Sequence, residues 1–138
     1  MTAPPAQPDD VGGSDSRATV LLVDDDPAIR RALARLLVRE GWTVVEAGSG
    51  AEGLAAVHRD APDVVVTDLN MPEMNGIEFL LAIQDQDPGL PVIAISGGGR
   101  IPKDSLLEDA NLLGAVEVIG KPFDPGSLIA AIRRHLNP

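Results

Sequence analysis

The chain contains no cysteine among its 138 residues. This absence excludes disulfides, thiolate metal sites and cysteine nucleophiles. No apolar run approaches the ~18 residues that a membrane-spanning helix needs. The N-terminus also lacks the apolar segment of a secretory signal. We therefore expect a cytoplasmic protein with no membrane partner.

Basic residues are scarce. Lys and Arg together number 11 against 21 Asp and Glu, which gives a formal net charge of −10. Binding to nucleic acid through phosphate contacts needs a basic face, so this balance argues against a nucleic-acid partner. Residues 1–17 are rich in Pro, Ala, Gly and Asp, and we expect them to form a flexible tail. Residues 18–138 have the length of one folded domain.

Short apolar segments alternate with amphipathic ones along the rest of the chain. Strands are predicted at residues 19–23, 42–47, 63–67, 91–95 and 115–119, each followed by a helix, the fourth at about 103–113. Such alternation predicts an α/β fold with a parallel five-stranded sheet and helices on both faces. Ligands of such sheets bind outside the carboxyl ends of the strands.

Helix boundaries carry their own signals. Asp26-Pro27 predicts a capping residue followed by proline at the first helical position, and Gly41 is expected to end that helix. Ser49 with Glu52 forms a capping box for the second helix. Helical spacing predicts that Ile29, Leu33, Leu36 and Leu37 face inward from the first helix, and Ile77, Leu80 and Leu81, with Phe79 as a further candidate, from the third.

Carboxylates gather at predicted strand ends. The first strand runs into Asp24 and Asp25, and the third runs into Asp68. Like charges held close together repel, and helix capping does not explain three convergent acids. A hard divalent cation such as Mg²⁺ prefers oxygen ligands and would neutralise the cluster. The sequence therefore predicts a metal site beside a reactive aspartate.

Two further polar residues follow the fourth and fifth strands. Ser96 ends the fourth strand, and Lys121 comes just after the fifth. With a metal bound, one carboxylate could attack a phosphoryl group as a nucleophile. The lysine ammonium would then neutralise charge on the phosphoryl oxygens, and the serine hydroxyl would donate a hydrogen bond to them.

Four short motifs, in order and at the ends of the right strands, make the chain recognisable. They are Leu22-Val23-Asp24-Asp25-Asp26-Pro27, Asp68-Leu69-Asn70-Met71-Pro72 through Met74-Asn75-Gly76, Ile95-Ser96-Gly97 and Lys121-Pro122-Phe123. Over residues 18–137 the chain resembles the receiver domain of two-component response regulators. The resemblance implies a flavodoxin-like (βα)5 doubly wound sheet with strand order 2-1-3-4-5.

The resemblance also implies roles for individual residues. Asp68 would be the phosphoacceptor, modified by a histidine kinase or a histidine phosphotransfer protein. The ligands of Mg²⁺, or of Mn²⁺ as an alternative ion, would be Asp25 directly, Asp24 through water, Asp68 and the backbone carbonyl of Asn70.

Signal output would follow from Ser96 and Lys121. The resemblance implies that the Ser96 hydroxyl moves onto the phosphoryl group, that Lys121 bridges to it, and that the Lys121-Pro122 bond is cis. The family usually has an aromatic residue three positions before the lysine, where this chain has Val118. Any output must then rely on movement of the backbone and loops.

Other charged residues receive simpler interpretations. The arginines of the first helix are expected to form a solvated face or a docking rim for a kinase; they are Arg30, Arg31, Arg35 and Arg39. His58 and His135 are expected to be exposed side chains without a metal role.

We therefore expect a stand-alone single-domain receiver that signals through protein contacts, because the chain ends shortly after the fifth helix. A homodimer through the face of the fourth helix, fifth strand and fifth helix is one expected assembly. We expect no enzyme activity beyond self-phosphorylation from a phosphodonor and autodephosphorylation. Two alternatives remain open. One is a haloacid-dehalogenase-like phosphatase, disfavoured because Asn70 occupies the place of its second aspartate. The other is a phosphorylation-independent interaction domain.

Overall fold

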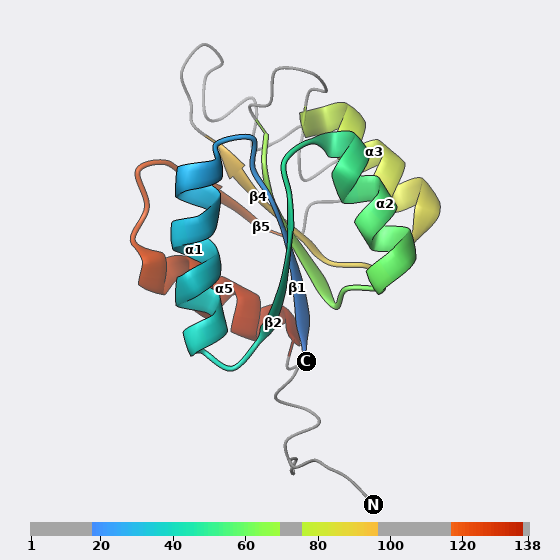
Figure 1. Ribbon diagram of the computed structural model, residues 1–138. Coiled ribbons are helices and arrows are strands. Elements are labelled where there is room, and N and C mark those ends of the chain that lie inside the picture. Colours follow the sequence, from blue (N-terminus) through green and yellow to red (C-terminus); the bar gives the residue numbers. More distant parts are fainter. Residues whose placement is uncertain (1–17, 70–75, 97–116, 137–138) are drawn as a thin grey trace, which may run out of the picture.

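The computed structural model describes residues 18–69, 76–96 and 117–136. Its strands form a parallel sheet of order β2-β1-β3-β4-β5, as predicted (Figure 1). The strands are β1 (Thr19–Val23), β2 (Thr43–Ala47), β3 (Val64–Asp68), β4 (Val92–Ser96) and β5 (Glu117–Gly120). The helices are α1 (Pro27–Arg39), α2 (Gly50–Asp60), α3 (Gly76–Gln86) and α5 (Pro125–Leu136). The predicted tail at 1–17 and the predicted helix at 103–113 lie outside the described residues.

Helices cover both faces of the sheet, with α1 and α5 on one side and α2 and α3 on the other (Figure 1). Strand β1 supplies side chains to both layers, because successive residues of a strand point to opposite faces. Leu21 and Val23 pack in the α2–α3 layer, whereas Val20 and Leu22 pack in the α1–α5 layer. Burial on both faces explains why this strand is a continuous apolar run.

The predicted boundaries of α1 are confirmed by their contacts. The Asp26 carboxylate accepts hydrogen bonds from the N–H groups of Ala28 and Ile29, at 3.0 and 3.2 Å. Pro27 is the first residue of α1, where its missing N–H costs nothing. Gly41 follows the helix with φ of 98°, a left-handed conformation that favours glycine.

The faces that two helices bury differ from the prediction. Phe79 is fully buried in α3, whereas Leu81, expected inside, is 48% exposed. Helix α3 packs against α2 as well as against the sheet, so its buried stripe is rotated toward Phe79. In α1, Ile29 is 44% exposed, while Leu33 and Leu37 are buried as expected.

One glycine permits the close approach of α2 and α3. A Cβ atom on Gly53 would lie 2.7 Å from Cζ of Phe79 and 3.2 Å from Cγ2 of Val23. Real Cβ atoms essentially never come closer than 3.0 Å to a neighbour. The buried ring of Phe79 therefore depends on the missing side chain at position 53.

We expect Gly53→Ala to lower the free energy of unfolding by about 1–3 kcal/mol, the usual cost of overpacking a core. This loss should outweigh the gain of about 1 kcal/mol in helix propensity. Gly89→Ala is the matched control, because a Cβ there would meet nothing within 4 Å. Urea unfolding measures both variants, and a Gly53→Ala protein as stable as the Gly89→Ala protein would contradict this account.

Candidate functional site

The register of the sheet brings the acidic strand ends together. Val23 of β1 is paired with Thr67 of β3, so the residues that follow them, Asp24 and Asp68, emerge side by side. Both aspartates are buried: Asp24 is 4% exposed and Asp68 is 5% exposed. The adjacent Asp25 lies in the turn before α1 and is exposed. Within the described residues, one carboxylate oxygen from each of these three aspartates lies within 4.8 Å of the other two.

A lysine reaches the same point from β5. Lys121 directly follows β5, and its Nζ lies 3.0 Å from Oδ2 of Asp68. The lysine side chain is 31% exposed and that of Asp68 is 6% exposed, so the ion pair lies at the mouth of the cluster. The Lys121-Pro122 peptide bond is cis, as the resemblance implied.

Asp24 is a buried acid held by a backbone hydrogen bond. Its Oδ1 accepts a hydrogen bond from the N–H of Asp26 at 2.9 Å. Burial raises the pKa of its carboxyl group above the ordinary value of 3.8, and the carboxylates of Asp68 and Asp25 add to that rise. The Asp26 hydrogen bond and the Lys121 ammonium lower the pKa but do not cancel the rise. The folded chain therefore makes this carboxylate costly to ionise by itself.

The donor set fits a hard divalent cation. Three carboxylates with oxygens this close supply the ligands that Mg²⁺ or Mn²⁺ prefers, and a cation would remove the repulsion among them. Asp24, Asp25 and Asp68 are therefore the described residues that could hold a metal. Asn70, the further predicted ligand, lies outside the described residues.

The predicted switch residues are placed only by their backbones or packing. Ser96 ends β4 and pairs with Gly120 in the ladder to β5, and its side chain lies outside the described part. Val118 is partly buried and packs against the α2–α3 core layer. The structure therefore brings Asp24, Asp25, Asp68 and Lys121 together at one edge of the sheet.

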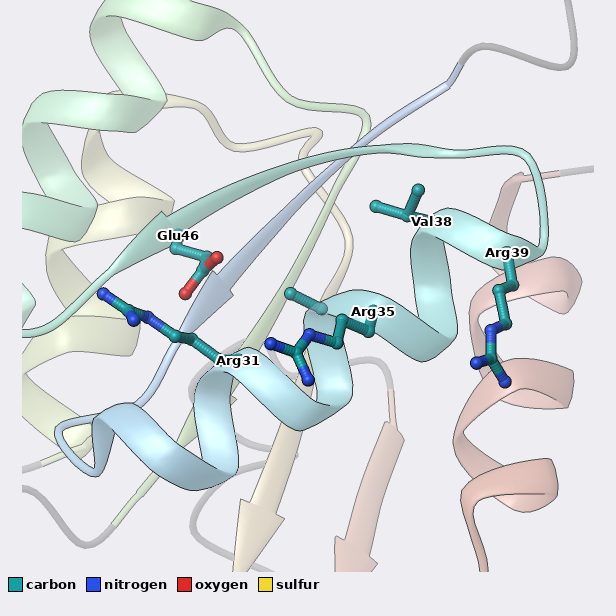
Figure 2. Close-up of a pocket in the computed structure, with 6 residues that line it drawn as sticks. Arg31, Arg35, Val38, Arg39 and Glu46 are labelled. Atoms are coloured by element: carbon teal, nitrogen blue, oxygen red, sulfur yellow. The ribbon is translucent and has the colours of Figure 1, made fainter.

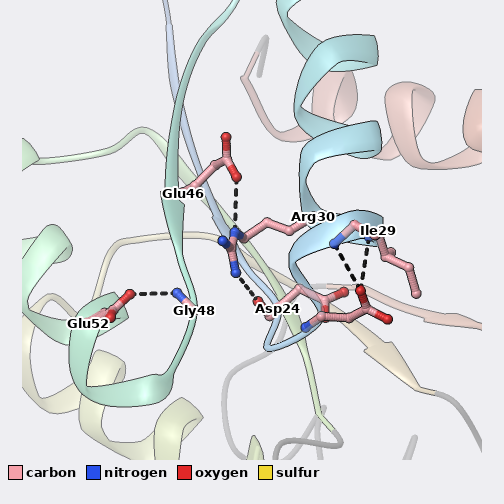
Figure 3. A network of polar contacts seen from close by, with 8 residues as sticks. Asp24, Ile29, Arg30, Glu46, Gly48 and Glu52 are labelled. Carbon is pink, nitrogen blue, oxygen red and sulfur yellow. Dashed lines mark hydrogen bonds and ion pairs between the residues drawn. The ribbon is translucent and has the colours of Figure 1, made fainter.

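Arg30 corrects one interpretation from the sequence. Helical periodicity groups it with the solvated arginines of α1, but its side chain is only 15% exposed. Its guanidinium donates to the backbone carbonyl of Asp24 and to the carboxylate of Glu46 (Figure 3). The sequence pattern indicates no role at the site for Arg30 or Glu46. The sequence offers one signal of such a role. Arg30 follows the acidic end of the first strand, and Glu46 lies at the end of the second strand.

The remaining arginines of α1 line a groove of about 400 Å³ beside the edge strand β2 (Figure 2). Its lining consists of Arg31, Ala34, Arg35, Val38, Arg39 and Glu46. These arginines are exposed, as predicted, and they form a basic surface on a chain of net charge −10.

The two histidines behave differently. His58 is exposed, as predicted. His135 is half-buried, with its Nε2 lying 3.1 Å from the Glu117 carboxylate, so the expectation of an exposed side chain was wrong there.

Among the described helices, none is long and apolar enough to cross a membrane.

Comparison with known proteins shows the family to which the fold belongs. Residues 20–133 match the response regulator receiver domain. The chain belongs to this family. This receiver is 43% identical over 115 residues to the transcriptional regulatory protein GlrR of Escherichia coli K12, a match that covers 83% of the chain but 25% of that protein. The chain thus spans about a quarter of the length of such relatives.

Other relatives are closer to it in size. The receiver is 31% identical to sporulation initiation phosphotransferase F of Bacillus subtilis, a match that covers 85% of this chain and 92% of that protein. Among solved structures, a receiver domain protein from Clostridium thermocellum superposes with a TM-score of 0.81 at 32% identity, covering 87% of this chain and 94% of that one. These likenesses extend across nearly the whole folded domain.

The raised pKa of Asp24 leads to a test by pH. Ionisation of this carboxyl group costs stability in the metal-free receiver, so its stability should fall as the pH rises through the raised pKa. We expect Asp24→Asn, which keeps an oxygen acceptor for the Asp26 N–H, to raise the free energy of unfolding at pH 7 by on the order of 1 kcal/mol.

The advantage of Asp24→Asn should fade as the pH falls toward 3.8, where the wild-type carboxyl group becomes protonated in both states. Urea unfolding in a metal chelator at several pH values measures it. Millimolar Mg²⁺ should stabilise the wild type more than the variant. A variant less stable than the wild type at pH 7 in chelator would contradict the assignment.

Proposed function

We propose that this receiver accepts a phosphoryl group on the carboxylate of Asp68 and passes the signal on through protein contacts. The observation that carries the proposal is the position of Asp68. Its buried carboxylate lies 3.0 Å from the Lys121 ammonium and shares the end of the sheet with the carboxylates of Asp24 and Asp25. Membership in the receiver family supports the same role.

The proposed chemistry is an in-line phosphoryl transfer. A carboxylate oxygen of Asp68 attacks the phosphorus of the phosphodonor, the bond from phosphorus to the leaving nitrogen or oxygen breaks, and an acyl phosphate forms. The Lys121 ammonium is close enough to Asp68 to stabilise the negative charge on the oxygens of the transferred phosphoryl group. Asp24 and Asp25, with Asp68, would hold Mg²⁺ or Mn²⁺, which when bound supplies positive charge to those oxygens.

The phosphodonor in this proposal is a histidine kinase or a histidine phosphotransfer protein. The family supports this class of donor, and the name of the Bacillus relative describes a phosphotransferase. The basic groove of α1 is the surface proposed to contact the donor, because it lies on the helix that begins at the acidic turn. Dimerisation through β5, α5 and the predicted helix at 103–113 is a further proposal.

The proposed output begins at Ser96, whose hydroxyl would move onto the phosphoryl group. Ser96 is the last residue of β4, and β4 pairs with β5 immediately before Lys121. Val118 leaves no aromatic ring at its position in β5 to rotate inward, so we propose that the change travels through the backbone of β4 and β5.

Labelling with radioactive acetyl phosphate and Mg²⁺ tests the acceptor. We expect the wild type to take up at most one phosphoryl group per chain and Asp68→Asn to take up none. Asp26→Asn is the matched control, because Asn caps a helix as well as Asp does and the residue is in the same acidic motif. Full labelling of Asp68→Asn would refute the assignment. Turnover of small phosphate esters beyond one equivalent per chain would favour a phosphatase instead.

The groove on α1 leads to a second test. We expect Arg35→Glu to slow phosphotransfer from a histidine kinase about tenfold, because a reversed charge at a docking rim mainly lowers the association rate. Labelling by acetyl phosphate, which needs no docking surface, should stay unchanged. Arg59→Glu on α2 is the control, since Arg59 is highly exposed and away from the groove. Equal slowing in both variants would show that the groove has no special role.

A further inference from the structure

Arg30 joins the acidic end of β1 to the edge strand β2. Its Nη1 donates to the backbone carbonyl of Asp24 at 2.9 Å, and its Nε donates to Oε1 of Glu46 at 3.0 Å (Figure 3). The side chain comes from the first turns of α1. One guanidinium therefore connects three elements at the base of the acidic turn.

The carbonyl of Asp24 lies where the ladder between β1 and β2 stops. The last pair of that ladder is Val23 with Ala47, and the N–H of Asp24 still reaches the carbonyl of Ala47 at 3.1 Å. Beyond this point the chain turns toward α1. A buried carbonyl needs a donor, and Arg30 provides it from a side chain.

The surroundings leave room for the guanidinium. A Cβ atom on Gly48 would lie 3.1 Å from Nη1 of Arg30, which is closer than most contacts allow. Gly48 is itself held, since its N–H donates to Oε1 of Glu52 at 2.7 Å. The guanidinium thus lies against bare backbone on one side and is oriented by Glu46 on another.

We propose that Arg30, oriented by Glu46, is a positioning residue for the metal-binding acids. It fixes the backbone of Asp24 so that the carboxylates of Asp24 and Asp25 converge on that of Asp68. The hydrogen bond from the Asp26 N–H fixes the Asp24 side chain, and Arg30 fixes its main chain. This inference rests on the proposed function, in which those acids hold the cation for phosphorylation.

The role requires an arginine in particular. Its planar fork presents donors in two directions, so it can bond a carbonyl and a carboxylate at once, whereas the single ammonium of lysine is a point charge on a flexible stem. A lysine would keep the positive charge near the acids but would lose the geometry. Comparing the two side chains therefore separates positioning from simple charge neutralisation.

The test measures Mn²⁺ affinity by electron paramagnetic resonance for Arg30→Met and Arg30→Lys. We expect about tenfold weaker binding for Arg30→Met, in the range typical when an outer contact of a metal ligand is removed. Arg30→Lys should recover little of this loss. Arg35→Met is the matched control, an exposed arginine on the same helix, and its affinity should stay within about twofold of the wild type.

A second readout does not depend on the metal. In the metal-free protein, the amide resonances of Asp25 and Asp26 should shift in both Arg30 variants and stay in place in Arg35→Met. If Arg30→Met does not fold, Glu46→Ala takes its place, since it removes the carboxylate that orients the guanidinium and should weaken Mn²⁺ binding.

The outcomes separate this inference from the proposed function. Wild-type affinity in a folded Arg30→Met protein, or in Glu46→Ala where that variant replaces it, would overturn the positioning role. So would an equal loss in Arg35→Met. Failure of the wild type to bind Mn²⁺ or to be labelled would overturn the proposed function instead, and the amide comparison would then decide alone whether Arg30 orders the acidic turn.

Discussion

Repulsion among three carboxylates is the constraint around which this receiver is organised. A parallel sheet delivers all its strand ends to one edge, and here the register places Asp24 beside Asp68 and the turn adds Asp25. Neighbouring groups offset the charge of two of these acids. Lys121 pairs with Asp68, whereas the Asp26 N–H and the Lys121 charge only partly offset the burial of Asp24. The remaining cost is what a divalent cation would relieve.

The rigid parts of the fold supply the precision that such a cluster needs. Strands β1 and β3 are buried on both faces, so the positions of their last residues are set by packing from two layers. The turn after β1 lacks that support, and side chains replace it: Asp26 caps α1, and Arg30 bonds the carbonyl of Asp24. Helix α1 therefore fixes the acidic turn through the cap at its first residues and through the side chain of Arg30.

Much of this arrangement could be predicted from local patterns, because those patterns have local causes. Strand ends, the cap at Asp26 and the left-handed Gly41 follow from nearest neighbours in the chain, and the four motifs identified the acids and the lysine. The role of Arg30 could not be predicted, since its partner Glu46 is 16 residues away and periodicity placed it on a solvated face. The full burial of Phe79 could not be predicted for a similar reason, because it depends on Gly53 in another helix.

The position of Lys121 bears on how a phosphoryl group on Asp68 would be read. The ammonium that pairs with the Asp68 carboxylate follows β5 directly, and β5 pairs with the strand that ends at Ser96. A change in charge at Asp68 would therefore reach the end of β5 through the Lys121 side chain, and the end of β4 is paired with that strand. Val118, packed against the α2–α3 layer, is small and β-branched and has few rotamers to exchange. A signal from this site would accordingly be carried by displacement of the two strand ends rather than by rotation of a buried ring.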